Sequence, residues 1–328
     1  SLVRDGLQRL NATSRPGLLA LIQAAGLRPG RIDSQDIAFG LAPRLNAAGR
    51  LDTALRAYEL LSTPDTERAE ALAGELHTMN AERQELTEQL CERARQAWRV
   101  GPPEPLILVA EEGFHKGIVG LVASRLTDEF YRPSLVIEVA GEHCRGSARS
   151  IPELNITEAL ASCADLLDRY GGHAMAAGFS LQAAHLPAFQ ERLLATVRAR
   201  LAGVELLPSL SIDAVCPLTD ATWEAAHALN ELRPFGQGHP VPVLASRGVR
   251  LRSSRIVGRG HLRLEVSDGR AVWDAIAFRQ AGVLSPLPSL LDLAYNLDVH
   301  EWNGETRLRL VVRDLRAAES LSHGDCQP

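Results

Sequence analysis

A short segment with a flexible backbone and a histidine stands at residues 171–178, which read Gly-Gly-His-Ala-Met-Ala-Ala-Gly. The adjacent glycines Gly171 and Gly172 allow the backbone to adopt positive φ or to pass very close to another group. His173 can carry a proton near neutral pH and can serve as a ligand. Such a segment could bind a phosphate or a sugar at close range. The pattern also fits a tight turn into a buried small-residue element, with a hydrogen-bonded histidine in the core.

A second group of phosphate-binding residue types comprises Arg44, Asn46 and Arg50, around a glycine-containing segment that we expect to be a loop. A guanidinium can form paired hydrogen bonds with a phosphate, and an asparagine can bond a sugar or a backbone group. No acidic residue occurs in this segment before Asp52. The alternative is an interdomain loop whose arginines form salt bridges.

Two further places could bind an anion. Ser147 and Arg149 lie two residues apart on a predicted strand, so their side chains would point to the same side and could contact one phosphate. The alternative is a solvated edge strand. His115 precedes Gly117, where we expect a helix to begin, and a helix N-terminus offers free N–H groups to an anion. Alternatively, His115 only completes an N-terminal turn.

Basic residues cluster between residues 232 and 264, where seven arginines occur without any acidic residue. The net charge of the whole chain is −5, so its overall charge does not indicate nucleic-acid binding. On predicted strands these arginines could line a groove that follows a single-stranded backbone, with Arg250 and Arg252 on one face. The alternative is an ordinary solvated arginine-rich face. The candidates are Arg247, Arg250, Arg252, Arg255, Arg259 and Arg263.

Composition limits the class of protein. The chain has 328 residues, 45% of them hydrophobic and 23% charged, which are ordinary values for a soluble globular protein of about two or three domains. No run approaches the roughly 18 apolar residues of a membrane span. The five cysteines are scattered without a Cys-x-x-Cys pair, which indicates neither a disulfide framework nor a zinc knuckle and favours a cytoplasmic location.

One long helix is predicted over residues 65–99, with Thr63 as its cap and with one stripe of mostly apolar side chains. Such a helix would span roughly 50 Å and suits a strut between domains. Before it, residues 37–41 predict a short strand or a buried link. After it, residues 106–200 alternate strands and helices, which is typical of a compact α/β domain, with Asn155 as the predicted cap of a helix over 156–167.

Strand-like segments dominate from residue 207 onward, among them residues 209–214, 241–246 and 248–257. The pairs Asp268-Gly269 and Asn303-Gly304 are typical of hairpin turns. Several short strands with turn signals predict a small β-barrel, and such barrels often bind oligonucleotides.

Four motifs in this order resemble the RecJ family, bacterial 5′→3′ exonucleases specific for single-stranded DNA within the DHH phosphoesterase superfamily. The motifs are residues 43–51 (PRLNAAGRL), residues 114–126 (FHKGIVGLVASRL), residues 146–150 (GSARS) with 171–173 (GGH), and residues 232–240 (LRPFGQGHP). The resemblance implies an α/β plus all-β chain. Its expected parts are 1–60, the end of a DHH catalytic domain; 61–101, a connecting helix; 102–206, a DHHA1 domain; 207–316, an OB-type domain; and 317–328, a disordered tail.

The Asp-His-His motif that gives the superfamily its name is absent, and so is any Asp-x-Asp. The resemblance therefore implies the C-terminal portion of a RecJ-like protein, with Mn²⁺ or Mg²⁺ held by upstream residues and no catalytic or metal-binding residue in this chain. It places Ser147 and Arg149 near the 5′-terminal or scissile phosphate, and residues 171–173 beside the metal cleft. The implied substrate contacts are Arg44, Asn46, Arg50, His115, Ser147, Arg149, Gly171, Gly172 and His173.

By resemblance, the full protein would hydrolyse single-stranded DNA from its 5′ end in repair and recombination. This chain alone would bind the strand without cleaving it. Single-strand-binding protein and a helicase would be further partners, and a monomer is expected. Two alternatives stay open. One is a DHH–DHHA1 phosphoesterase for small nucleotides, against which the barrel argues. The other is a non-catalytic module that binds single-stranded DNA or a protein.

Overall fold

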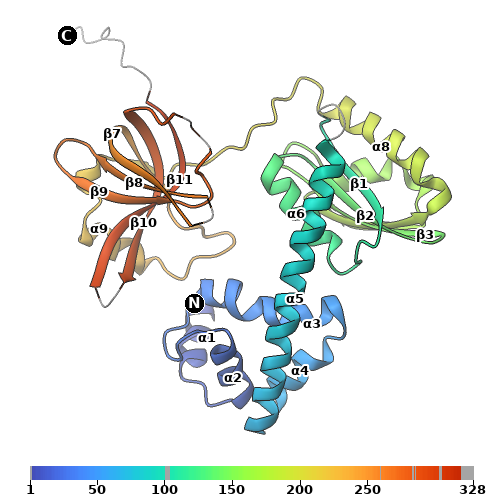
Figure 1. The fold of residues 1–328 in the computed structure, drawn as a ribbon, viewed down its shortest axis with the longest axis horizontal. Helices are drawn as coiled ribbons and strands as arrows, with labels where there is room; N and C mark the ends of the chain where they lie inside the picture. The colour runs from blue at the N-terminus through green and yellow to red at the C-terminus, as the bar shows by residue number, and fades with distance from the viewer. Residues whose placement is uncertain are drawn as a thin grey trace. The chain divides into compact units, whose positions relative to one another are not determined.

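The computed structural model describes residues 2–99, 104–258, 260–282, 284, 286–302 and 305–318. The chain divides into two compact units, Ser1–Pro208 and Ser209–Pro328. Figure 1 shows the course of the chain through both units. None of the described helices is both long enough and apolar enough to cross a membrane.

The first unit begins with a helical part. Its elements are α1 (Leu2–Asn11), α2 (Pro16–Ala24), the π-helix η1 (Asp36–Leu41), α3 (Ala42–Leu51) and α4 (Leu55–Ser62). The strand or link predicted for residues 37–41 is wrong, because η1 runs directly into α3. The loop predicted around Arg44, Asn46 and Arg50 is also wrong, because all three lie on α3. Burial of Ala47 and Ala48 outweighs the cost of Gly49 within this helix.

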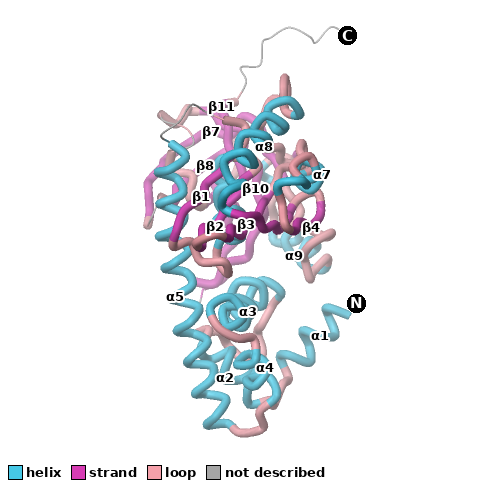
Figure 2. Tube along the Cα trace, turned by 90° about the vertical axis from the view of Figure 1, so that its right-hand side faces the viewer, coloured by secondary structure: helices cyan, strands magenta, loops and turns pink. Residues whose placement is uncertain are grey.

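The long predicted helix is present as α5 (Thr66–Arg99), whose 34 residues span about 51 Å. Thr63 is not its cap. The carboxylate of Asp65 instead accepts hydrogen bonds from the N–H groups of Glu67 at 2.9 Å and Arg68 at 3.3 Å. The first half of α5 packs on the helical part through Leu72 and Leu76. Its second half packs on the sheet of the same unit, so α5 connects the two parts (Figure 2).

A five-stranded sheet of order β1-β2-β3-β5-β4 forms the second part of this unit. β1 and β2 are parallel and the other neighbours are antiparallel. The strands are β1 (Ile107–Glu112), β2 (Ser134–Ala140), β3 (His143–Arg149), β4 (Arg169–His173) and β5 (Ala176–Gln182). The alternation of strands and helices predicted for this region is confirmed.

Helices cover both faces of this sheet. On one face α6 (Val119–Phe130) and α5 pack on the side chains of Ile107, Val109 and Val136. On the other face the cluster around Phe179 and Leu181 joins three further elements of the chain. These are α7 (Ile156–Ala161), η2 (Ala164–Leu166) and α8 (Leu186–Arg200), with η3 (Ala183–His185) just before α8.

Two predictions for this part concern helix limits and turns. The side chain of Asn155 caps α7 by accepting from the N–H of Thr157 at 3.1 Å, as predicted. The helix expected up to residue 167 ends at Ala161, and the short η2 follows. Residues 171–173 were expected in a turn, but they form the end of edge strand β4. The turn is residues 174–175, because the backbone of β4 pairs with β5 as far as His173 opposite Ala176.

The second unit is a β-barrel, as predicted. Its strand order is β10-β11-β9-β8-β7-β6, closed by pairing of β10 with β7 around a core that includes Val249, Leu264, Leu291 and Tyr295. The strands are β6 (Ala214–Val215), β7 (Leu244–Val257), β8 (His261–Ser267), β9 (Val272–Ala277), β10 (Leu290–Trp302) and β11 (Glu305–Ala317).

Several details of the barrel differ from the expectation. The strand expected over 209–214 is reduced to β6, and the strands expected over 241–246 and 248–257 are one strand. The sequence patterns missed η4 (Leu218–Asp220) and α9 (Trp223–Glu231). The turn at Asp268-Gly269 is present, with the Asp268 carboxylate accepting from the N–H of Ala271 at 2.8 Å. The turn expected at residues 303–304 and the tail from residue 319 lie outside the described residues.

Candidate functional site

In the first unit, the positive charge of Arg50 acts on two arginines from other elements. Arg50 lies in the last turn of α3, Arg83 in the middle of α5 and Arg149 at the end of β3. Burial lowers the pKa of Arg149, and the positive charge of Arg50 lowers it further. The pKa of Arg83 is lowered by burial and then by the charges of Arg50 and Arg125. The guanidinium groups stay charged, so like charges are held together here.

In the described part of the chain, these arginines donate their hydrogen bonds to neutral acceptors. Arg83 donates to the side-chain oxygen of Asn80 at 3.0 Å and 3.3 Å. Arg149 donates to the Ser147 hydroxyl at 3.2 Å and to the Ala148 carbonyl at 2.8 Å. Arg50 donates to the carbonyl of Gly117 at 3.2 Å. We call Arg50, Arg83 and Arg149 the arginine cluster. A bound anion would balance its charge through charge-assisted hydrogen bonds.

Two glycines near the start of α6 let Arg50 and Arg149 approach this helix closely. A Cβ on Gly117 would lie 2.1 Å from the carbonyl oxygen of Arg50, so only a glycine lets α3 approach so closely. A Cβ on Gly120 would lie 3.0 Å from the Ser147 hydroxyl oxygen and 3.2 Å from Nη2 of Arg149. The two glycines therefore position Arg50 and Arg149 beside the same turn.

His115 forms part of this turn. Its Nδ1 accepts a hydrogen bond from the N–H of Gly117 at 3.1 Å. The helix expected to open at Gly117 begins at Val119 instead. The alternative interpretation of His115, a histidine that completes the N-terminal turn, matches this hydrogen bond. With Nδ1 accepting, a neutral His115 carries its proton on Nε2.

Strand register brings the sheet residues of the prediction onto one face. Arg149 stands opposite Ala176, which stands opposite His173. In the next row on this face, Ser147 stands opposite Gly178, which stands opposite Gly171. Directly opposite residues point to the same face, and adjacent strands lie about 4.8 Å apart. The Cα atom of His173 therefore lies roughly 10 Å, two strand spacings, from the Cα atom of Arg149.

Only small residues lie between the side chains of Arg149 and His173 on this face of the sheet. They are Ala176 and Gly178 on β5 and Gly171 on β4, beyond the part of the sheet that α6 covers. His173 is exposed, which rules out the buried core histidine considered above, and its carbonyl accepts from the Thr157 hydroxyl at 2.8 Å. We call this exposed surface of β4 and β5 the small-residue shelf. A sugar–phosphate backbone could approach it closely.

One residue of the predicted set, Arg44, points away from the arginine cluster. Arg44 donates to the carbonyl of Gly40 at 2.7 Å and, through Nε, to Nδ1 of His77 at 3.3 Å, and burial lowers its pKa. Asn46 is exposed and shares a helix face with Arg50, four residues later. Because α3 is a helix, Arg44 lies on a different side from this pair.

Arg83 is the member of the arginine cluster that the sequence reasoning missed. Its position in the mostly apolar stripe of the long helix predicts only a packing face. A charged residue within this apolar stripe could have revealed it, because a side chain at such a position faces the elements on which the helix packs. Asn80, one turn earlier, is 95% buried, with 5% of its surface exposed, and holds the Arg83 side chain.

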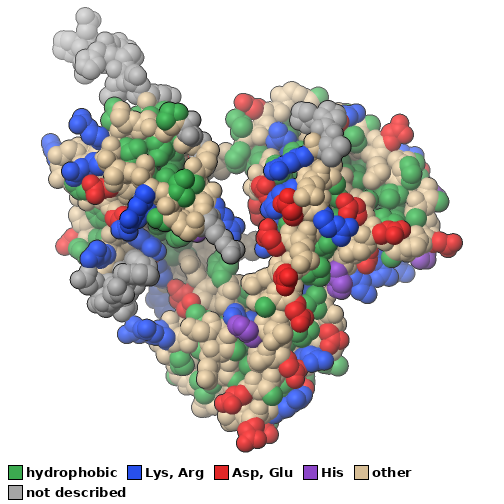
Figure 3. Space-filling view, in the orientation of Figure 1, with side chains coloured by type: hydrophobic (Ala, Val, Ile, Leu, Met, Phe, Trp, Pro, Cys, Tyr) green, Lys and Arg blue, Asp and Glu red, His purple; other side chains and the backbone are tan. Residues whose placement is uncertain are grey.

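Two of the arginines that were expected to line a groove on the barrel form ion pairs with acidic residues. Arg263 bonds the Asp274 carboxylate at 2.8 Å and 2.6 Å, and Arg252 lies 3.4 Å from Glu265. A register shift between Leu251 and Ser253 disturbs the alternation on which a shared face for Arg250 and Arg252 depended. Figure 3 shows basic side chains interspersed with acidic ones on the visible face of the barrel. Arg247, Arg250 and Arg255 are exposed, and Arg259 lies outside the described residues.

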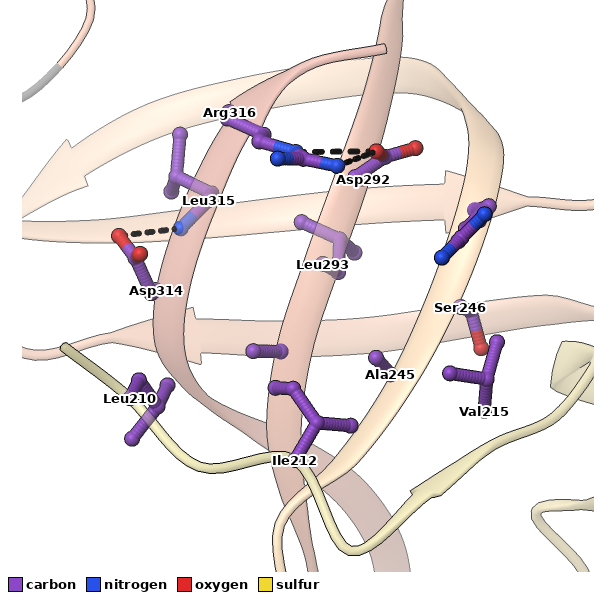
Figure 4. A pocket seen from close by; sticks show the side chains of 12 residues that line it. Leu210, Ile212, Val215, Ala245, Ser246, Asp292, Leu293, Asp314, Leu315 and Arg316 are labelled. Atoms are coloured by element: carbon purple, nitrogen blue, oxygen red, sulfur yellow. Dashed lines mark hydrogen bonds and ion pairs between the residues drawn. The ribbon is translucent and has the colours of Figure 1, made fainter. Parts of the chain in front are cut away.

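One hollow on the barrel lies beneath the segment that leads into β6 (Figure 4). Leu210 and Ile212 on that segment face Leu293 and Ala245 on the strands. At the rim Arg316 bonds Asp292 at 3.1 Å. Apolar side chains share this lining with Ser246, Arg247 and Asp314, and the two acidic residues balance the two basic ones, so the chemistry of the hollow does not match that of a phosphate site.

Metal ligands are not grouped in the described part of the chain. No group of three or more His, Cys, Asp or Glu side chains that could hold a metal ion occurs there. The arginine cluster repels cations, and its neutral oxygen partners are already hydrogen-bonded to it. The residues at this site therefore do not fit a divalent metal ion.

Comparison with known proteins identifies the family. A model of the DHHA1 domain matches residues 104–199, and a model of the RecJ OB domain matches residues 212–314. The chain belongs to the RecJ family. The expected α/β plus all-β fold, with a DHHA1 domain and an OB-like barrel, is confirmed.

Named RecJ proteins are similar along nearly the whole chain. The single-stranded-DNA-specific exonuclease RecJ of Bacillus subtilis is 34% identical over 96% of this chain and 41% of its own length. That of Thermus thermophilus is 35% identical over 99% of this chain and 46% of its own. The crystal structure of T. thermophilus RecJ with Mn²⁺ superposes with a TM-score of 0.84 at 34% identity, covering 98% of this chain and 47% of that one. The chain thus spans about half the length of these relatives.

Proposed function

We propose that this chain binds a single DNA strand for an exonuclease of the RecJ type, which hydrolyses phosphodiester bonds from the 5′ end. The observation that carries the proposal is the arginine cluster, whose charges are held together with neutral partners. A terminal phosphate carries close to two negative charges, whereas an internal phosphodiester carries one. Because several guanidinium groups converge without a carboxylate, the cluster suits the 5′-terminal phosphate best.

The roles of the individual residues follow from their placement. Arg149 and the Ser147 hydroxyl contact the terminal phosphate from the sheet, and Arg50 and Arg83 contact it from the two helices. The small-residue shelf lets the next sugars and phosphates approach the backbone, and His173 donates to a phosphate oxygen at its far edge. Asn46 extends the contact along α3. The position of Arg44, next to His77, favours a role in holding α3 against α5.

In this proposal, the metal ions belong to the whole enzyme and are not bound by this chain. T. thermophilus RecJ has been crystallised with Mn²⁺ and with Mg²⁺. Since the residues at the arginine cluster do not fit such an ion, we propose that it is held outside this chain. Residues 1–60 would then be the end of the DHH catalytic domain, 61–101 the connecting helix, 102–206 the DHHA1 domain and 207–316 the OB-type domain. We further propose a cytoplasmic monomer that works with single-strand-binding protein and a helicase, on the strength of the family alone.

A binding and cleavage assay tests this proposal. The 328-residue chain is mixed with a fluorescent single-stranded 20-mer or with the matching duplex, with and without Mn²⁺. We expect binding of the single strand, weaker binding of a blunt duplex, and no shortening of either in Mn²⁺. Equal binding of both forms would contradict the proposed substrate. Shortening of the strand would contradict the assignment of the metal to residues outside this chain, and hydrolysis of dinucleotides would favour the small-nucleotide alternative.

A further inference from the structure

A second hollow on the barrel unit has the chemistry of a nucleobase site. It measures about 530 Å³ and lies between the first turn of α9, the start of β9 and the start of β11. Two tryptophans line it, with apolar, acidic and basic neighbours. Its lining includes Trp223, Glu224, Val272, Trp273, Asp274 and Arg307. It lies entirely within one unit.

The two indole rings differ in exposure and in what holds them. Thr222 caps α9 by accepting from the N–H of Ala225 at 3.2 Å, which fixes the helix start at Trp223. Trp223 itself is 42% exposed. Trp273 is half-buried, and its Nε1–H donates to the carbonyl of Leu218 at 3.2 Å. An exposed indole beside one that is fixed by a hydrogen bond offers a flat stacking surface.

The charges around the hollow nearly balance. Asp274 is bonded at two atoms by Arg263, and Glu224 stays ionised because the helix N–H groups and the Thr222 hydroxyl lower its pKa. Arg307 is exposed at the opposite side. A phosphate gains little from such a balanced site, whereas an uncharged ring with amino and carbonyl groups can stack and hydrogen-bond there.

We propose that this hollow binds one unstacked nucleobase of the DNA strand, with the Trp223 ring as its stacking surface. This inference rests on the proposed function. The route to the hollow is given by strand register: Arg263, which holds Asp274 at the rim, stands opposite the exposed Arg255 on β7. The sugar–phosphate backbone passes these arginines while one base turns into the hollow. Such stacking tolerates any base, because every base has a flat face.

The test compares strands with and without bases. Affinities of the full 328-residue chain for a 20-residue thymidine strand and for an abasic strand of equal length are measured by fluorescence anisotropy at several salt concentrations. Trp223→Ala is expected to weaken binding of the thymidine strand about tenfold, to leave the abasic strand unaffected, and to leave the salt dependence unchanged. Trp223→Phe, which keeps a flat ring, is expected to lose less than threefold. Circular dichroism verifies that both variants are folded.

Each other outcome overturns the inference in a recognisable way. Unchanged affinity of Trp223→Ala for the thymidine strand would show that the hollow serves another ligand, such as a protein segment. Equal weakening on both strands would assign Trp223 to barrel structure or to phosphate binding. If the unaltered chain binds neither strand, the proposed function fails together with this inference. A second readout is quenching of tryptophan fluorescence by the thymidine strand, which must be reduced in Trp223→Phe.

Discussion

At the residue scale, the candidate site depends on small side chains as much as on charged ones. Gly117 admits the carbonyl of Arg50, and Gly120 admits Ser147 and Arg149. The cluster keeps like charges together, which stabilises a bound anion but not the empty fold. Sites of this kind commonly trade stability for binding.

Gly120→Ala should separate binding from stability. Alanine has the higher helix propensity, by about 1 kcal/mol, so the free energy of unfolding should stay equal or rise. The new Cβ would push the ends of Ser147 and Arg149 by a few tenths of an ångström. We expect affinity for a 5′-phosphorylated strand to fall several-fold in anisotropy titrations. Gly74→Ala in α5, where a Cβ meets nothing within 4 Å, is the matched control and should leave affinity unchanged.

Arg83→Gln tests the arginine that sequence reasoning missed. Removing one of several like charges should not reduce stability against urea, because the Asn80 contact can be kept by the glutamine amide. Affinity for single-stranded DNA should fall, and its salt dependence should become less steep. Arg68→Gln on the same helix, whose arginine pairs with Glu59 at 2.7 Å, is the control. If both variants bind alike, Arg83 does not contact the strand.

At the element scale, the edge strand β4 positions half of the site. Its two glycines have different surroundings. A Cβ on Gly172 would lie 2.2 Å from the backbone oxygen of Ala176, whereas a Cβ on Gly171 would meet nothing within 4 Å. Substitutions at Gly172 and at Gly171 can therefore distinguish a role in strand pairing from a role in the surface of the small-residue shelf.

Alanine at each glycine should give opposite results. Gly172→Ala is expected to destabilise the chain by about 2 kcal/mol, because backbone must move. Gly171→Ala should unfold at the same urea concentration as the unaltered chain but bind single-stranded DNA more weakly, since its methyl group stands on the shelf. Urea unfolding and anisotropy on both variants check this. Equal stabilities would contradict the register of β4 on β5.

Elements whose signals are local were predictable from the sequence. The apolar stripe of α5, the Asn155 cap and the barrel strands are examples. Residues 36–51 were misjudged because packing on α5 decides their helical form. The pairing of the barrel arginines with Asp274 and Glu265 was not visible because it depends on cross-strand register. Arg83 joins Arg50 and Arg149 only through tertiary contacts, so sequence spacing could predict only local pairs such as Ser147 and Arg149.

At the scale of the whole molecule, the proposals assign different DNA contacts to the two units. The first unit would supply the arginine cluster and the small-residue shelf, and the barrel would supply exposed arginines and the tryptophan-lined hollow. The proposed contacts of the first unit are mostly to phosphate, so they should dominate the salt dependence of binding, whereas the hollow should contribute a salt-independent share. The proposed contact of Arg255 is to phosphate and that of Trp223 is to a base. We therefore expect the effects of Arg255→Gln and Trp223→Ala on the binding free energy to add, and a departure from additivity would show that the two contacts are coupled.

The most direct test of the central claim is whether the arginine cluster recognises a 5′-terminal phosphate. Affinities of the unaltered chain, Arg149→Ala and the control Arg192→Ala are measured for one strand with a 5′-phosphate or a 5′-hydroxyl. Arg192 lies on α8 and pairs with Asp165, away from the cluster. We predict that the phosphate strengthens binding of the unaltered chain and of the control about tenfold, as charged hydrogen bonds allow, and that Arg149→Ala abolishes this gain. An equal gain in all three proteins, or none in any, would contradict the account.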